Sequence, residues 1–118
     1  MPSTEESLEN STVGYACGYK TEKEEIVRVV SNLKIKGKIK RTLFNWSPGM
    51  DFCLLASGRI ESMINFNTEI YDFLGAKLIL KEAGCIVTDF KGNPSGDFDK
   101  NFVASCNNKI QNKVLTLV

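Results

Sequence analysis

The sequence contains no histidine, and this absence excludes a wide range of chemistry. Without histidine there is no Ser–His–Asp triad, no imidazole acid or base, and no imidazole ligand for a transition metal. The 118 residues carry a net charge of +1, so no overall field attracts the chain to nucleic acid or to an anionic membrane. No apolar run reaches the length of a membrane span. Catalysis would therefore have to rest on carboxylates, lysines, cysteines or an oxygen-bound cation.

Cysteine is scarce and scattered. None of the four cysteines belongs to a C-x-x-C pair, so the sequence predicts no zinc site. Each lies among apolar residues without an evident cationic neighbour that would favour a reactive thiolate. The start of the chain, residues 1–11, is polar and acidic, unlike a secretion signal. We therefore expect a cytoplasmic protein with four reduced, buried cysteines, namely Cys17, Cys53, Cys85 and Cys106.

Short β-type runs alternate with amphipathic helical segments along the chain. Strands are predicted over residues 13–19, 34–43, 59–66, 85–89 and 102–106. Helices are predicted after caps at Thr21, Ser47, Asn67 or Thr68, and Asn107 or Asn108. This alternation predicts an α/β fold with helices on the faces of a sheet. We expect one domain over residues 13–118, preceded by a polar lead-in of residues 1–12.

Asp72 is the acidic residue whose position is most informative. It opens a helix that is apolar almost all round until Lys77, Lys81 and Glu82, a pattern that predicts burial between two layers. A carboxylate in the first helical turn is favoured either by the helix dipole or by a metal ion. Ligands of α/β sheets bind beyond the strand ends, beside helix N-termini, and Asp72 has that kind of position. Asp51, in the preceding helix, is expected to be a surface or locally bonded carboxylate.

A second pattern is the alternation of lysines with Ile35, Gly37 and Ile39 over residues 34–43. A period of two predicts a strand with one solvated face, whose lysines discourage edge-to-edge pairing. The alternative is a basic stripe for phosphates or RNA, formed by Lys34, Lys36, Lys38 and Lys40. It would make binding strongly salt-dependent. Because the chain has no general basic excess and no aromatic residues among these lysines, we favour the solvated strand.

The order of four motifs resembles that of the inositol monophosphatase family. Residues 46–58, WSPGMDFCLLASG, resemble the family's G-S-A-A-L-D-L-C-x-V-A-x-G helix. Residues 71–85 resemble W-D-x-x-A-G-x-x-I-x-x-E-A-G-G, residues 87–92 resemble V-T-D-x-x-G, and residues 104–107 resemble a closing A-S-N segment. The resemblance implies an about five-stranded mixed sheet with helices on both faces, as in the C-terminal subdomain of the inositol monophosphatase and fructose bisphosphatase fold.

The resemblance also implies roles for particular residues. The family hydrolyses phosphate monoesters, often of inositol, with magnesium, and the Asp of its W-D motif is a metal ligand, which corresponds to Asp72. The residues that correspond to its substrate contacts are Asn65, Trp46, Ser47 and Pro48. These depart from the family pattern, because Trp46 replaces a glycine, Pro48 removes a backbone donor, and Asn65 is not an acid. The surface that would contact the alcohol part of the substrate is therefore altered.

The family's D-P-[IL]-D-G-[ST] motif and its accompanying glutamate are absent, so the resemblance implies a C-terminal half only. Magnesium needs about six oxygen ligands, which Asp72 alone does not supply. We therefore expect no catalytic residue in this chain alone, and magnesium with a sugar or inositol phosphate only when an N-terminal half completes the site. An exposed apolar face predicts a homo-oligomer or a partner subunit, and no nucleic acid or membrane partner. The alternative is a non-catalytic binding or oligomerisation module.

Overall fold

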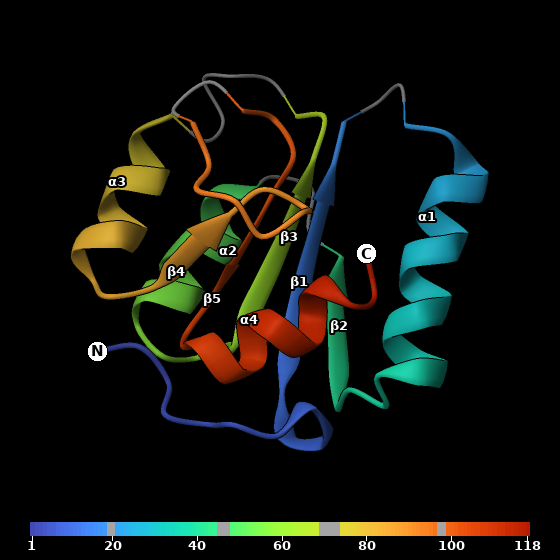
Figure 1. The fold of residues 1–118 in the computed structure, drawn as a ribbon, viewed down its shortest axis with the longest axis horizontal. Coiled ribbons are helices and arrows are strands. Elements are labelled where there is room, and N and C mark those ends of the chain that lie inside the picture. The colour runs from blue at the N-terminus through green and yellow to red at the C-terminus, as the bar shows by residue number, and fades with distance from the viewer. Residues whose placement is uncertain (19–20, 45–47, 69–73, 97–98) are drawn as a thin grey trace.

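The computed structural model describes residues 1–18, 21–44, 48–68, 74–96 and 99–118, which form a five-stranded sheet between helices (Figure 1). The strand order is β2-β1-β3-β5-β4. β1 pairs in parallel with both β2 and β3, whereas β5 runs antiparallel to β3 and β4. The predicted mixed sheet is thus confirmed. Its strands are β1 (Thr12–Cys17), β2 (Arg41–Phe44), β3 (Ser62–Phe66), β4 (Ile86–Thr88) and β5 (Phe102–Ser105).

Helices cover both faces of this sheet, with α4 in front and α2 behind it in Figure 1. The parallel connections β1-α1-β2 and β2-α2-β3 run in opposite directions along the sheet, and right-handed crossovers then place α1 and α2 on opposite faces. The predicted cap of the last helix is confirmed, because the Asn107 side chain accepts from the N–H of Ile110 at 3.0 Å. The helices are α1 (Lys23–Ser31), α2 (Pro48–Ala56), α3 (Leu74–Glu82) and α4 (Asn108–Leu115).

The core lies on both sides of the central strands. Every residue of β1 from Val13 to Ala16 is buried, which is typical of a parallel strand covered on both faces. On the α2 side, the rings of Phe52 and Phe102 are stacked with their centroids 6.1 Å apart. At the opposite edge, the Tyr15 ring stacks on Phe44 of β2 at 5.5 Å. The core therefore binds α2 to β5 and β2 to β1, the elements that carry the predicted site.

The predicted strand over residues 34–43 is wrong in its first part. α1 continues into a wider, π-type helical turn, η2 (Asn32–Lys36), and β2 begins only at Arg41. Leu33 is completely buried four residues after the buried Val29, so the helical face simply extends by one turn. Ile35 is 73% exposed, so the expected alternation of exposed lysines with buried apolar residues is not found here. The basic stripe expected of an RNA-binding strand does not exist in this form.

Two further local expectations are corrected. Glu22, not Thr21, is the N-cap of α1, and its side chain makes no cap hydrogen bond; Thr21 lies one residue earlier, where its N–H donates to Gly18 O. The cysteines differ in burial: Cys53 is exposed and Cys17 half-buried, whereas the other two are buried; all four thiols are free. Among the described residues, no helix combines the length and apolar character needed to cross a bilayer.

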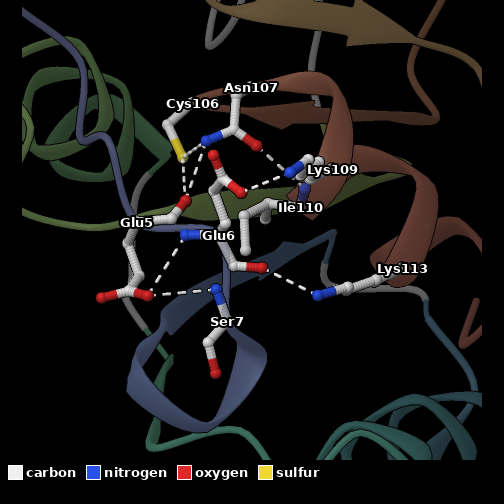
Figure 2. A network of polar contacts seen from close by, with 8 residues as sticks. All are labelled: Glu5, Glu6, Ser7, Cys106, Asn107, Lys109, Ile110 and Lys113. Atoms are coloured by element: carbon white, nitrogen blue, oxygen red, sulfur yellow. Dashed lines mark hydrogen bonds and ion pairs between the residues drawn. The ribbon is translucent and has the colours of Figure 1, made fainter.

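The polar lead-in is fastened to the start of α4 (Figure 2). The Glu5 carbonyl accepts from Asn107 Nδ2 at 2.8 Å and from the Cys106 thiol at 3.7 Å. Lys113 Nζ donates to Glu6 O at 2.8 Å. The Glu6–Lys109 ion pair is more than half exposed on both sides and so contributes little. The first η1 turn (Leu8–Asn10) then leads directly into β1.

We expect the stability of the fold to decrease between pH 8 and pH 10.5. Burial raises the pKa of Cys106 to about 11 and that of Tyr15 to about 12, from ordinary values of 9.0 and 10.0. Above pH 9 the unfolded chain releases the Cys106 proton while the folded chain retains it, so rising pH favours unfolding. Urea unfolding at pH 8, 9.5 and 10.5 should show a falling midpoint, with a smaller fall in Cys106→Ser. A midpoint that is constant over this range would contradict the expectation.

Candidate functional site

The carboxyl ends of the three parallel strands form the edge at which the sequence predicts a site. β1 ends at Cys17, β2 at Phe44 and β3 at Phe66, and these strands are adjacent and parallel. Their ends therefore lie side by side, about 5 Å apart from one strand to the next. The chain passes from this edge into α2 and then into α3, whose amino ends follow β2 and β3. Such an edge, lined with helix N-termini, is where α/β sheets bind ligands.

Most of the predicted site residues cannot be placed on this edge. Trp46, Ser47 and Asp72 lie outside the described residues, and of Pro48 only the backbone is described, as the first residue of α2. Their proposed contacts to substrate and metal therefore stay predictions. In the sequence they occupy the connections β2–α2 and β3–α3, whose described ends meet at this edge. Asn65 is the predicted site residue whose side chain the structure describes.

Asn65 lies on β3 with no exposed surface and links two segments. Its Nδ2 donates to Thr68 Oγ1 at 2.9 Å and to the Lys100 carbonyl at 2.8 Å. Its Oδ1 is buried and accepts no hydrogen bond from the residues that the structure describes. The Lys100 carbonyl can only accept a hydrogen bond, so the site requires a donor, which an ionised acid would not provide. Asn65 therefore joins the end of β3 to the chain that leads into β5.

Lys77 is a buried lysine that connects α3 to the loop before β5, a role that the sequence pattern did not reveal. On α3 it is only 1% exposed, although it was expected to begin the polar part of the helix. Its Nζ donates to Ser95 Oγ at 2.8 Å, to Gly96 O at 2.7 Å and to Asp99 O at 2.8 Å, and lies 4.4 Å from the centroid of the Phe102 ring. A buried ammonium requires such partners. The available signal was its position three residues before the buried Leu80, on the same helix face.

Asp51 is buried as well, so of the two alternatives expected for it, a surface or a locally bonded carboxylate, the surface position is wrong. In the first turn of α2 it has no exposed surface, and its carboxylate lies over Gly14 of β1. A Cβ at Gly14 would lie 2.8 Å from both Cγ and Oδ2 of Asp51, so glycine makes the close approach possible. An acid at the amino end of a helix is favoured by the helix dipole. Asp51 thus helps to fix the start of α2 against the central strand.

The described residues form no metal-binding group, and the hollow that they line beside this edge does not suit a phosphate. A hollow of about 500 Å³ beside the same edge is lined by Thr21, Glu22, Glu24, Glu25, Phe66 and Asn67. Its three carboxylates would repel a phosphate. Across the described parts of the chain, no three His, Cys, Asp or Glu side chains group closely enough to hold a metal ion. A complete metal site therefore needs residues beyond these.

The sequence profile described as the inositol monophosphatase family matches residues 2–118. The chain belongs to the inositol monophosphatase family. This confirms the resemblance found in the motifs, and members of this phosphatase family are generally magnesium-dependent. The described residues do not by themselves fit that metal.

Particular relatives show how much of the family this chain represents. A fructose-1,6-bisphosphatase/inositol-1-monophosphatase of Thermotoga maritima is 28% identical over 85 residues, which make up 72% of this chain and 33% of that protein. A Nus factor SuhB of Vibrio cholerae is 31% identical over 87 residues, covering 73% of this chain and 32% of that protein. The chain therefore spans about a third of the length of these curated relatives.

Solved structures confirm the fold class. The crystal structure of the extragenic suppressor protein suhB from Bartonella henselae aligns with a TM-score of 0.85 at 22% identity, over 98% of this chain and 44% of that one. An IMPase of Thermotoga maritima aligns with a TM-score of 0.77 at 26% identity, over 98% and 43%. Nearly all of this inositol monophosphatase family chain thus matches less than half of each of these structures.

We predict that Asn65→Asp destabilises the fold although it restores an acid at this position. A carboxylate would face the Lys100 carbonyl without a proton to donate, and we expect the free energy of unfolding to fall by about 3 kcal/mol at pH 7. The loss should be smaller at pH 4.5, where a protonated acid donates again. Urea unfolding at both pH values measures this.

The matched control is Asn101→Asp. Asn101 is exposed and uses only its Oδ1, which accepts from the Asn67 N–H at 2.8 Å, so an aspartate preserves the bond. We expect this variant to remain within about 0.5 kcal/mol of the wild type, as is usual for surface substitutions. Equal stability of the two aspartate variants at pH 7 would contradict the donor role of Asn65.

Proposed function

We propose that this chain is the C-terminal half of a magnesium-dependent phosphomonoesterase and acts only together with an N-terminal half. The observation that carries the proposal is the family match over residues 2–118 in a chain that aligns with only 43–44% of the two solved relatives described above. The described residues hold no metal-binding group of three acids, cysteines or histidines. The other half would then supply most of the metal ligands, and the substrate class would be a sugar or inositol phosphate.

Within this proposal the chain contributes one metal ligand and part of the substrate surface. Asp72 would be the metal ligand, and Trp46, Ser47, Pro48 and the neighbourhood of Asn65 would contact the alcohol part of the substrate. The buried side chains act indirectly: Lys77 fixes the segment from Ser95 to Asp99 against α3. Asp51, in the first turn of α2, would in the same way hold the start of that helix against β1. The free thiols favour a reducing compartment, and we propose the cytoplasm.

We further propose that the other half covers the outer face of α3. Leu78 and Ile79 are 61% and 59% exposed there, and Met50 is 59% exposed on α2, which packs beside α3. The sequence pattern predicts burial of α3 between two layers, and in this chain the sheet provides one layer only. The solved relatives are more than twice as long as this chain, so their additional residues are enough to form a second layer. Burying such side chains contributes about 25 cal/mol per Å².

A non-catalytic binding module is the second candidate. One observation favours it: Asn65 is engaged in internal hydrogen bonds and leaves no acid at a position where the family has one. Several relatives are also named Nus factor SuhB, a name that does not describe a phosphatase. In this case Asp72 would be a helix-start carboxylate without a metal.

A reconstitution experiment tests the enzyme proposal. The part of the Thermotoga maritima relative that precedes its matched region is joined to this chain, both as separate fragments and as one covalent chimera, and phosphate release from an inositol monophosphate is measured with magnesium. We expect release from the chimera, and a loss of at least about 100-fold in Asp72→Asn, because even outer partners of metal ligands contribute 10- to 100-fold. The control is Glu82→Gln, an exposed acid at the end of α3, which should change nothing.

The remaining outcomes separate the two candidates. Turnover by the isolated chain would contradict the proposal that an N-terminal half is needed. Equal turnover by the wild-type chimera and its Asp72→Asn variant would show that Asp72 is not a metal ligand of the reaction. If the chimera folds but releases no phosphate as the wild type, as Asp72→Asn or as Glu82→Gln, the result would favour the binding module.

The docking face gives an independent prediction. The double variant Leu78→Ser/Ile79→Ser should weaken binding of the N-terminal fragment by about 10- to 100-fold, because two large apolar side chains leave the interface. The control is Val27→Ser/Ile35→Ser, which removes comparably exposed side chains, 62% and 73%, from α1 and η2. Titration with a fluorescently labelled fragment measures both affinities.

Sedimentation of this chain alone identifies the occupant of the α3 face. A monomer that binds the fragment supports the proposal. A dimer that dissociates in the Leu78→Ser/Ile79→Ser variant would instead assign the face to a second copy of the chain, and equal weakening by both double variants would exclude a specific face.

A further inference from the structure

Cys85 and Cys106 face each other across the last two strands. β4 and β5 are antiparallel, with Val87 opposite Ala104 and Ile86 opposite Ser105. One further step along this register places Cys85 opposite Cys106. Residues that are directly opposite in an antiparallel pair project from the same face of the sheet. The two thiols are therefore neighbours, although the sequence separates them by the whole of β4, the following loop and β5.

The backbone hydrogen bonds define the kind of pair that they form. The Cys106 N–H donates to Glu61 O at 2.9 Å, on the β3 side. The Cys85 N–H donates to Leu80 O at 3.0 Å, at the end of α3. Both N–H groups thus point away from the facing cysteine, as in a non-hydrogen-bonded pair. In such pairs the Cα atoms are about 4.5 Å apart and the side chains are closest, and a disulfide spans Cα distances of about 4.4–6.8 Å.

The surroundings keep both groups in the thiol form. Each cysteine is only 6% exposed. Burial raises the pKa of the Cys85 thiol and raises that of Cys106 to about 11. Cys106 also donates its thiol hydrogen bond to the Glu5 carbonyl of the lead-in, which lies across it (Figure 2). Oxidation therefore needs a strong or prolonged oxidant at neutral pH, because little thiolate is present.

We propose that Cys85 and Cys106 are a reversible oxidation site that closes to an intramolecular disulfide. With a hydroperoxide as oxidant, the two thiols lose two electrons and two protons, the S–S bond forms, and the O–O bond breaks to give water and an alcohol or a second water. With a small disulfide, two exchange steps transfer the same electrons and release two small thiols. The bond would connect the Gly84–Cys85 turn after α3 to the Cys106–Asn107 start of α4. This inference does not depend on the proposed function.

The test uses the folded full chain with Cys53→Ser, which removes the exposed thiol that would cross-link two molecules. Diamide or hydrogen peroxide is added in native buffer, the remaining thiols are blocked, and the protein is mapped by mass spectrometry without reduction. We expect a mass loss of two hydrogen atoms, a Cys85–Cys106 peptide, and full recovery with dithiothreitol. Cys17→Ser in the same background should keep the bond, whereas Cys85→Ser and Cys106→Ser should abolish it.

Three results would overturn the proposal. One is a disulfide of Cys17 with either partner, another is the absence of any intramolecular bond after prolonged oxidation, and the third is a Cys85–Cys106 bond that forms only in urea. Because the native mapping needs no substitution at either proposed cysteine, a serine variant that fails to fold does not affect the decision.

Discussion

The pairing of β1 with β2 on one side and β3 on the other is the constraint on which the rest of the structure depends. Parallel strands cannot be joined by a tight turn, so each connection must carry a helix across a face of the sheet. This requirement places α1 and α2 on opposite faces and brings the carboxyl ends of all three strands to one edge. The described amino ends of α2 and α3 are consequently drawn towards the same edge, where we propose that a phosphate ester binds.

Buried polar side chains hold this edge in position. Asp51 fixes the start of α2 over Gly14, Asn65 joins β3 to the approach to β5, and Lys77 holds the loop before β5 against α3. Polar groups are costly to bury without partners, and the hydrogen bonds of Asn65 and Lys77 make the arrangement specific, because another packing would break them. They are also close in sequence to the segments that carry Ser47 and Asp72. The buried polar groups thus lie near the amino ends of α2 and α3, whose positions determine the geometry of the proposed site.

The exposed apolar face of α3 is the surface on which we propose that an N-terminal half packs. One side of the helix packs on the sheet through Leu80, while Leu78 and Ile79 remain exposed. A helix with apolar residues on opposite sides is explained most simply by a layer on each side. The proposed second layer would also supply the further oxygen ligands that a magnesium site needs, in addition to Asp72, the ligand proposed from this chain. Binding surface and catalytic site would then be completed by the same partner.

The sequence by itself determined the order of the elements, the α/β class and the family. These depend on local periodicity, helix caps such as Asn107, and short motifs such as residues 71–85, all of which act over a few residues. Only the tertiary structure decided that α1 continues past Leu33, that Lys77 is buried, and that Cys85 faces Cys106. These features depend on which distant segments become neighbours: Leu117 beside Asn32, the loop at Ser95 beside α3, and β5 beside β4. Strand register and burial are properties of pairs of segments, and a single sequence pattern describes one segment at a time.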